Sequence, residues 1–349
     1  MEIRRVQLTG GSSYVITLPK EWIKSANIKK NDPVGIFMQS DGSLLITQKM
    51  NRDPEQRMKE FKVDDKTKQI FFLRKLIGAY IAGYTSIKIT SDRRITHSIR
   101  KTVRDFTQRT IGQEVVEETE KSVTIKDIFN PAELPFNRSI KRMHIIVKGM
   151  YEDAMIAVQK NNKILAEDVI SRDNDVDRLH WLTARQYNTL LKNISFAEKM
   201  GVTIELASVY FLISRIIERI ADHVIIIANN IIDTGDNIVE KSILEKLKNA
   251  GILSLEILNK SIGSFFKRNI KEANENIDAV IKLRSQCEEI NNLTLNLDGA
   301  IAISLGYISE STRRIGEYAE DISEHVINYL IDEDKNSDKQ SQTKPPLLK

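Results

Sequence analysis

The sequence feature that most constrains the fold is a long stretch, residues 131–334, with no proline after Pro135 and with helical hydrophobic periodicity nearly throughout. Proline breaks a helix from within, so this stretch can form long uninterrupted helices. The periodicity is interrupted near Asn161, Gly201, Gly235, Asn269 and Asn296. These breaks predict a bundle of six long helices and a multi-domain, mostly α-helical protein.

Length and charge predict several domains. At about 150 residues per domain, 349 residues correspond to two or three domains. Residues 1–130 hold 24 Lys and Arg against 16 Asp and Glu, whereas residues 131–349 hold 28 against 32. The basic part favours an anionic partner such as nucleic acid and the acidic part a metal cation, although imbalances of this size also occur without such partners. We expect domains at 1–50, 51–130 and 131–333, and a disordered polar tail at 334–349.

Composition excludes several classes of protein. Hydrophobic residues make up 41% and charged residues 29%, which is typical of a globular protein. No apolar run approaches the ~20 residues of a transmembrane helix, and no signal peptide opens the chain. The single cysteine, Cys287, excludes a disulfide framework or a cysteine-based zinc site within one chain. We therefore expect a cytoplasmic protein.

The first 50 residues predict a small β unit. Strands are expected at 3–8, 14–18, 34–38 and 44–47, with a short helix at 20–26. Asp41-Gly42 between apolar runs is a strong hairpin signal. About 50 residues bury too little apolar surface to form a stable core in one chain. We therefore expect the unit to interleave with a second copy.

Residues 51–130 predict a small α/β linker domain. Helices are expected at 66–82 and 93–110, with Asp92 capping the second, and a strand at 86–90 between them. A hairpin is expected from 113–118 and 122–128. The second helix carries five basic residues on the side opposite its apolar face, which suits either solvent or DNA.

Two carboxylate pairs in the helical part are the strongest candidates for chemistry. Asp173 and Asp177 lie four residues apart on one predicted helix, and Glu218 and Asp222 lie four apart on the next. Each pair projects from one helix face, and like charges there repel. If the two helices pack face to face, a hard or borderline cation would offset four converging carboxylates.

Alternatives to a metal site remain open. The carboxylates could form a solvated stripe, or salt bridges with Arg172, Arg178, Arg215 and Arg219. His180 and His223 lie close enough in sequence to ligate or to orient the carboxylates. In a divergent second three-helix repeat, Arg284 and Arg313 replace the first carboxylate of each pair, and Glu288 and Glu317 remain. We predict a buried Arg–Glu quartet there in place of a metal.

The N-terminal segment resembles the swapped-hairpin DNA-binding domain of the AbrB/SpoVT family. The match runs from Arg4 through the Pro19-Lys20-Glu21 motif and the Lys30-Asn31-Asp32 turn to the Asp41-Gly42 hairpin. Asn31 stands where the family usually has glycine, and asparagine also accepts a positive φ. The resemblance implies a homodimer that binds DNA, with Arg4, Arg5, Lys20 and Lys24 as phosphate contacts.

The helical part resembles the PhoU family of phosphate-homeostasis regulators. The stretches that carry the resemblance are 169–179 and 218–223. The family has two three-helix repeats whose paired carboxylate motifs bind metal clusters. The resemblance implies a divalent or trivalent metal ion, iron or zinc, at Asp173, Asp177, Glu218 and Asp222. Carboxylate ligands also suit magnesium. Arg284 and Arg313 depart from the pattern, which puts a second metal site in doubt.

Together the two resemblances imply a transcriptional regulator of phosphate uptake, similar to archaeal phosphate-uptake regulators, and not an enzyme. The alternative is an adaptor that does not bind DNA and that contacts a phosphate transporter or a sensor kinase. A di-iron enzyme is disfavoured because such bundles usually carry two Glu-x-x-His motifs, and here only Asp177-x-x-His180 approaches one.

Overall fold

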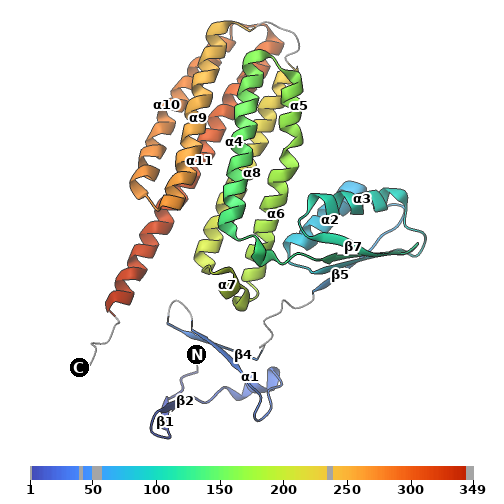
Figure 1. Cartoon of the computed structure of the whole chain (residues 1–349), viewed down its shortest axis with the longest axis vertical. Helices are drawn as coiled ribbons and strands as arrows, with labels where there is room; N and C mark the ends of the chain where they lie inside the picture. Colours follow the sequence, from blue (N-terminus) through green and yellow to red (C-terminus); the bar gives the residue numbers. More distant parts are fainter. Residues whose placement is uncertain (1, 39–41, 49–56, 234–238, 343–349) are drawn as a thin grey trace. The chain divides into compact units, whose positions relative to one another are not determined.

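The computed structural model describes residues 2–38, 42–48, 57–233 and 239–342. The chain divides into two compact units, Met1–Glu55 and Gln56–Lys349. We describe each unit by itself (Figure 1).

The N-terminal unit contains two antiparallel hairpins and one short helix. Strands β1 (Gln7–Thr9) and β2 (Ser13–Val15) pair around Gly10 and Gly11, both of which have positive φ. Helix α1 (Lys20–Ser25) follows, and β3 (Gly35–Met38) pairs with β4 (Leu44–Thr47). The expected elements are all present, with shorter first strands. Asn31 has φ 73°, as its place in a glycine position predicted, whereas Asp41 lies outside the described residues.

No described residue of this unit is buried. Large apolar side chains stand in solvent, with exposed fractions of 61% for Leu8, 77% for Tyr14 and 81% for Met38. A folded unit normally buries such side chains, so this one lacks a core within a single chain.

The second unit begins with a mixed four-stranded sheet, which we call the sheet lobe (residues 57–128). Its strands are β5 (Met58–Lys62), β6 (Ser86–Thr90), β7 (Gln113–Glu118) and β8 (Ser122–Asp127), in the order β5-β6-β8-β7. Only the β5–β6 pair is parallel. Helices α2 (Gln69–Ile81) and α3 (His97–Arg109) pack on the sheet through a core that includes Phe72, Ile87, Phe106 and Ile125.

The structure differs from two predictions in this lobe. Strand β5 was not expected, because its sequence Met-Lys-Glu-Phe-Lys is mostly charged and exposed, as suits an edge strand. Helix α3 begins later than expected, and Asp92 does not cap it. Thr96 does, because its side chain accepts a hydrogen bond from the Ile99 amide.

The rest of the unit is a helical bundle. Its helices are α4 (Phe136–Lys160), α5 (Lys163–Ser171), α6 (Asp173–Leu190), α7 (Ile194–Met200), α8 (Ile204–Asp233), α9 (Lys241–Lys267), α10 (Ile270–Thr294) and α11 (Gly299–Gln342). The predicted breaks near Asn161, Gly201, Asn269 and Asn296 are present, and Gly235 lies outside the described residues.

Two boundaries in the bundle were predicted wrongly. The expected second long helix is divided into α5, α6 and α7, because the chain turns at Arg172 and leaves helical geometry at Asn193, where φ is −144°. Of the tail expected to be disordered at 334–349, the part up to Gln342 is helical, and residues 343–349 lie outside the described residues. Its residues are polar, but none before Pro345 prevents a helix from continuing.

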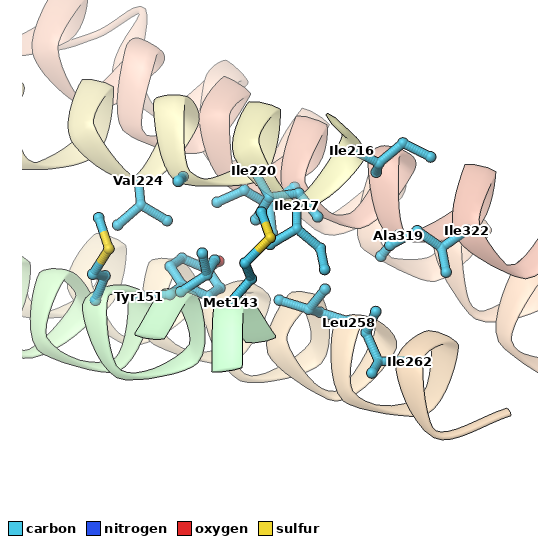
Figure 2. Close-up of a cluster of buried hydrophobic side chains, with 14 of the residues drawn as sticks. Met143, Tyr151, Ile216, Ile217, Ile220, Val224, Leu258, Ile262, Ala319 and Ile322 are labelled. Atoms are coloured by element: carbon cyan, nitrogen blue, oxygen red, sulfur yellow. The ribbon is translucent and has the colours of Figure 1, made fainter. Parts of the chain in front are cut away.

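The bundle core lies where α4, α8, α9 and α11 meet. Figure 2 shows Met143 and Tyr151 of α4 facing Ile217, Ile220 and Val224 of α8. Leu258 and Ile262 of α9 and Ala319 and Ile322 of α11 close the same cluster. Cys287 of α10 is also buried, and burial raises its thiol pKa to about 11, as expected for an unreactive core cysteine.

Candidate functional site

The core positions one of the two predicted carboxylate pairs. On α8, Ile217, Ile220 and Val224 recur at helical spacing and point into the bundle core. Glu218 and Asp222, each one residue or two away from these, therefore project from a different face of the same helix. That face packs on α6, which carries Asp173 and Asp177.

Helices α6 and α8 run antiparallel along this contact. His180 Nδ1 lies 3.1 Å from Ser214 Oγ, and the Tyr187 and Phe211 rings stack with centroids 5.1 Å apart. Residue numbers thus rise along α6 as they fall along α8. This register brings the first turns of α6 opposite Glu218 and Asp222, as predicted for helices that pack face to face.

The four carboxylates influence one another electrostatically. Burial, followed by the charges of Asp173, Glu218 and Asp222, raises the pKa of Asp177 to about 7. Burial followed by the charge of Asp222 also raises the pKa of Asp173 and of Glu218. Burial raises the pKa of Asp222, against the nearby Arg219. The group, which we call the carboxylate cluster, therefore holds more negative charge than its surroundings offset.

In the described part of the chain, none of the four candidate arginines forms a salt bridge with the four carboxylates. Arg172 bonds to Asp153 at 2.6 Å and to Asp168 at 2.8 Å, and Arg178 contacts Asp175 at 3.9 Å. Both arginines are thus directed away from the cluster. Arg215 and Arg219 lower carboxylate pKa values there without closing an ion pair in the described part of the chain.

One cation near the cluster was missed by the sequence analysis. Arg109, the last residue of α3, lowers the pKa of Asp173 and of Asp177. The sequence showed it only as one of several basic residues on an amphipathic helix. Arg109 lies near the cluster because α3 packs against α6, and local sequence patterns do not predict this tertiary contact.

The donor types of the cluster fit a hard or borderline cation, but the side chains do not converge. Four carboxylates without an ion-pair partner are suitable ligands for magnesium, iron or zinc. Within residues 2–38, 42–48, 57–233 and 239–342, no three His, Cys, Asp or Glu side chains lie close enough to hold one ion. A bound ion would therefore require these side chains to rotate toward one another.

The two histidines near the cluster are engaged elsewhere. His180 contacts Ser214, and burial lowers its pKa to about 4. His223 Nδ1 lies 3.3 Å from Ser311 Oγ of α11, and burial lowers its pKa as well. Burial thus favours the neutral imidazole in both histidines, and each ring contacts a serine of a neighbouring helix.

The second repeat holds an Arg–Glu network, as predicted in part. Arg284 Nε bonds to Glu317 at 2.9 Å and its Nη2 to Glu320 at 2.7 Å. Arg313 reaches Glu317 at 2.5 Å and forms a bidentate pair with Glu310. Two details were wrong. Glu310 and Glu320 take the place expected for Glu288, since they share one face of α11 with Glu317. The network is also not buried, because Arg284 is 44% exposed.

The predicted DNA contacts are exposed on the N-terminal unit. Lys20 and Lys24 lie one turn apart on α1, and Arg4 pairs with Glu2 at 2.8 Å. Arg5 is also exposed. In the sheet lobe, Ile99, Val103 and Phe106 bury the apolar face of α3 as expected. Lys101 and Arg104 are exposed, whereas Arg100 pairs with Glu118.

Comparisons with known proteins identify both parts of the chain. Residues 140–231 match the PhoU domain family, and residues 7–54 match the family of the antidote-toxin recognition protein MazE, a bacterial antitoxin. The first range contains the whole carboxylate cluster. The chain thus carries a MazE/AbrB-type swapped-hairpin domain followed by a PhoU domain. Both domain families are regulatory and non-catalytic.

A solved structure shares the fold of the bundle. PhoU from Pseudomonas aeruginosa superimposes with a TM-score of 0.50 and 16% identity, over 57% of this chain and 96% of that one. The phosphate transport system regulatory protein PhoU from Streptococcus pneumoniae gives a TM-score of 0.48 and 16% identity, over 56% and 92%. No curated protein sequence matches the chain. None of the described helices is long and apolar enough to cross a membrane.

Proposed function

We propose that this chain, which joins a MazE/AbrB-type domain to a PhoU domain, is a cytoplasmic DNA-binding transcriptional regulator of phosphate uptake. The observation that carries the proposal is the combination of the two domains in one chain, with the carboxylate cluster inside the PhoU domain. The first domain type supplies DNA contacts and the second supplies a sensor.

DNA binding by a dimer is supported by the exposed apolar side chains of the N-terminal unit. Val6, Leu8 and Tyr14 need a partner surface, and a second copy of the same unit has the complementary side chains. A dimer doubles the set Arg4, Arg5, Lys20 and Lys24 along one DNA face. Neutralised phosphates release counterions, which strengthens binding at low salt.

Metal binding is supported by the excess negative charge of the carboxylate cluster. Asp173, Asp177, Glu218 and Asp222 would be the ligands. A bound iron, zinc or magnesium ion would supply the positive charge that draws α6 and α8 together at this point. Deprotonation of Asp177, whose pKa burial raises to about 7, would accompany binding.

The test is selection of fragmented host DNA by the full-length protein at near-physiological salt, followed by sequencing. The wild type is compared with Arg4→Ala/Arg5→Ala, and with Lys29→Ala/Lys30→Ala as a control that removes the same charge elsewhere in the unit. We expect discrete enriched sites that the first double variant loses and the second keeps. Featureless enrichment with a steep salt dependence would instead favour the adaptor that contacts a phosphate transporter or sensor kinase.

A further inference from the structure

A cavity of about 360 Å³ lies where the sheet lobe joins the bundle. Ile111 of the sheet lobe and Phe129, in the segment between the lobe and α4, line one side of it, and Arg142 of α4 and Arg178 of α6 line it from the bundle. Small-molecule sites typically measure about 300–1,000 Å³, so the cavity is large enough for a compact organic ligand. It is also larger than a bare phosphate ion requires.

The two arginines retain hydrogen-bonding capacity. Arg178 Nε is buried and donates to no partner in the described structure, and the contact of Arg178 Nη1 with Asp175 is long, at 3.9 Å. Arg142 is exposed and forms no ion pair or hydrogen bond with any residue the structure describes. A buried donor without an acceptor is costly, so an acceptor entering the cavity would be favoured.

The remaining walls are of two kinds. Phe129, Leu134 and Leu179 offer apolar surface, and the Phe129 ring can pack against a flat ring. Glu133 and Asp175 are exposed acceptors at the same cavity. A complementary ligand therefore has an anionic group for the arginines, an apolar flat body, and hydrogen-bond donors for the carboxylates.

We propose that this cavity binds a nucleoside monophosphate. The phosphate would accept from Arg142 and Arg178, because guanidinium groups match phosphate geometry. The base would lie against Phe129 and the leucines, and its N–H groups would donate to Glu133 or Asp175. This site is separate from the carboxylate cluster, because Asp175 lies about 200° around α6 from both Asp173 and Asp177.

The experiment measures binding of AMP, GMP, CMP and UMP to the full-length protein in EDTA. Fluorescence of Trp181, which packs against the sheet-lobe core one turn from Arg178, reports binding, and equilibrium dialysis checks it. Inorganic phosphate and the four nucleosides are the comparison ligands. Arg142→Gln and Arg178→Gln each remove one guanidinium group from the cavity. The charge-matched control is Arg138→Gln, because Arg138 is an exposed residue of α4 that does not line the cavity.

We expect at least one nucleotide to bind below about 1 mM and at least tenfold more tightly than its nucleoside or inorganic phosphate. Each cavity variant should weaken that binding by about tenfold or more, and the control should not. Thermal melts report whether each variant folds, and Arg142→Gln decides alone if Arg178→Gln does not fold. Absence of binding by all four nucleotides, equal binding of inorganic phosphate, or binding unaffected by Arg142→Gln would overturn the proposal.

Discussion

Arg185 donates from Nη2 to Asp127 Oδ2 at 2.6 Å, and the two side chains are only 3% and 6% exposed. Arg185 Nη1 also donates to the carbonyls of Tyr80 and Tyr84 at 2.6 and 2.9 Å. Its guanidinium stacks on the Tyr80 ring. A side chain of α6 thus fastens the sheet lobe to the bundle, on the helix that also carries Asp173 and Asp177.

Breaking this pair is expected to destabilise the second unit. Removing one partner of a buried ion pair typically costs about 3–5 kcal/mol, because the other charge remains buried. We expect Arg185→Met to lower the free energy of unfolding by about 3 kcal/mol in urea titrations. Lys62→Gln, which removes an exposed pair with Asp92 in the same lobe, should cost less than about 1 kcal/mol. Equal losses for both variants would contradict this account of the junction.

The carboxylate cluster should make the metal-free protein less stable as pH rises. The pKa of Asp177 is about 7 in the fold against 3.8 for an ordinary aspartate, so the folded protein keeps a proton that the unfolded chain has lost. Stability therefore falls between about pH 4 and pH 7 and levels off above. Partial solvation reduces the effect, and we expect a loss of about 1–2 kcal/mol in EDTA.

Asp177→Asn removes this titration and should flatten the stability profile over that pH range. Asp175→Asn, on the same helix but outside the cluster, should leave the slope unchanged. The measurement is chemical denaturation at pH 5 and pH 8 in EDTA. A wild type that is as stable at pH 8 as at pH 5 would remove the electrostatic argument for a cation site.

Metal binding is expected at the first repeat alone. In the second repeat, Arg284 and Arg313 both donate hydrogen bonds to the carboxylate of Glu317, so its negative charge is already balanced. We expect Asp177→Asn/Asp222→Asn to abolish bound iron and zinc, as measured by elemental analysis after dialysis. Asp175→Asn should retain the wild-type amount. If half of the metal persisted in the double variant, the second repeat would also bind metal, and the prediction of a single site would be wrong.

Dimerisation through the N-terminal unit can be tested on one strand. Leu8 and Gln7 point to opposite faces of β1. We expect Leu8→Glu to shift the full-length protein from dimer to monomer in sedimentation velocity, because it places a charge in the apolar interface. Gln7→Glu introduces the same side chain on the other face and should remain dimeric. A wild-type monomer at micromolar concentration would rule out the interleaved unit.

Much of the fold follows from local pattern. The helix of α4 could be predicted because Met143, Val147 and Met150 recur at helical spacing before the Asn161 break, where φ is 49°. Strand β6 alternates Ile87 and Ile89 with polar residues, and its bounds were predicted correctly. Strand β5 could not be predicted because its stability comes from pairing with β6, which is a tertiary contact.

The residues of the candidate site could be predicted from the sequence, but the contacts that bring them together could not. The i, i+4 spacing identifies Asp173 with Asp177 and Glu218 with Asp222 as pairs on one face each. Their mutual approach required the antiparallel register of α6 and α8, and the presence of Arg109 required the packing of α3. The Arg–Glu network shows the same limit, since the substituted arginines were evident but their partners Glu310 and Glu320 depended on side-chain reach.

The proposed regulator requires that metal binding at the carboxylate cluster changes the affinity of the N-terminal domain for DNA. The most direct measurement is the dissociation constant for a selected DNA site with metal and with EDTA, in the wild type and in Asp173→Asn/Asp222→Asn. Coupling between sites typically amounts to about 5–150-fold. We expect metal to change the wild-type constant by at least about fivefold and to leave the double variant unchanged. Equal affinity of metal-loaded and metal-free wild type for that site would contradict the account.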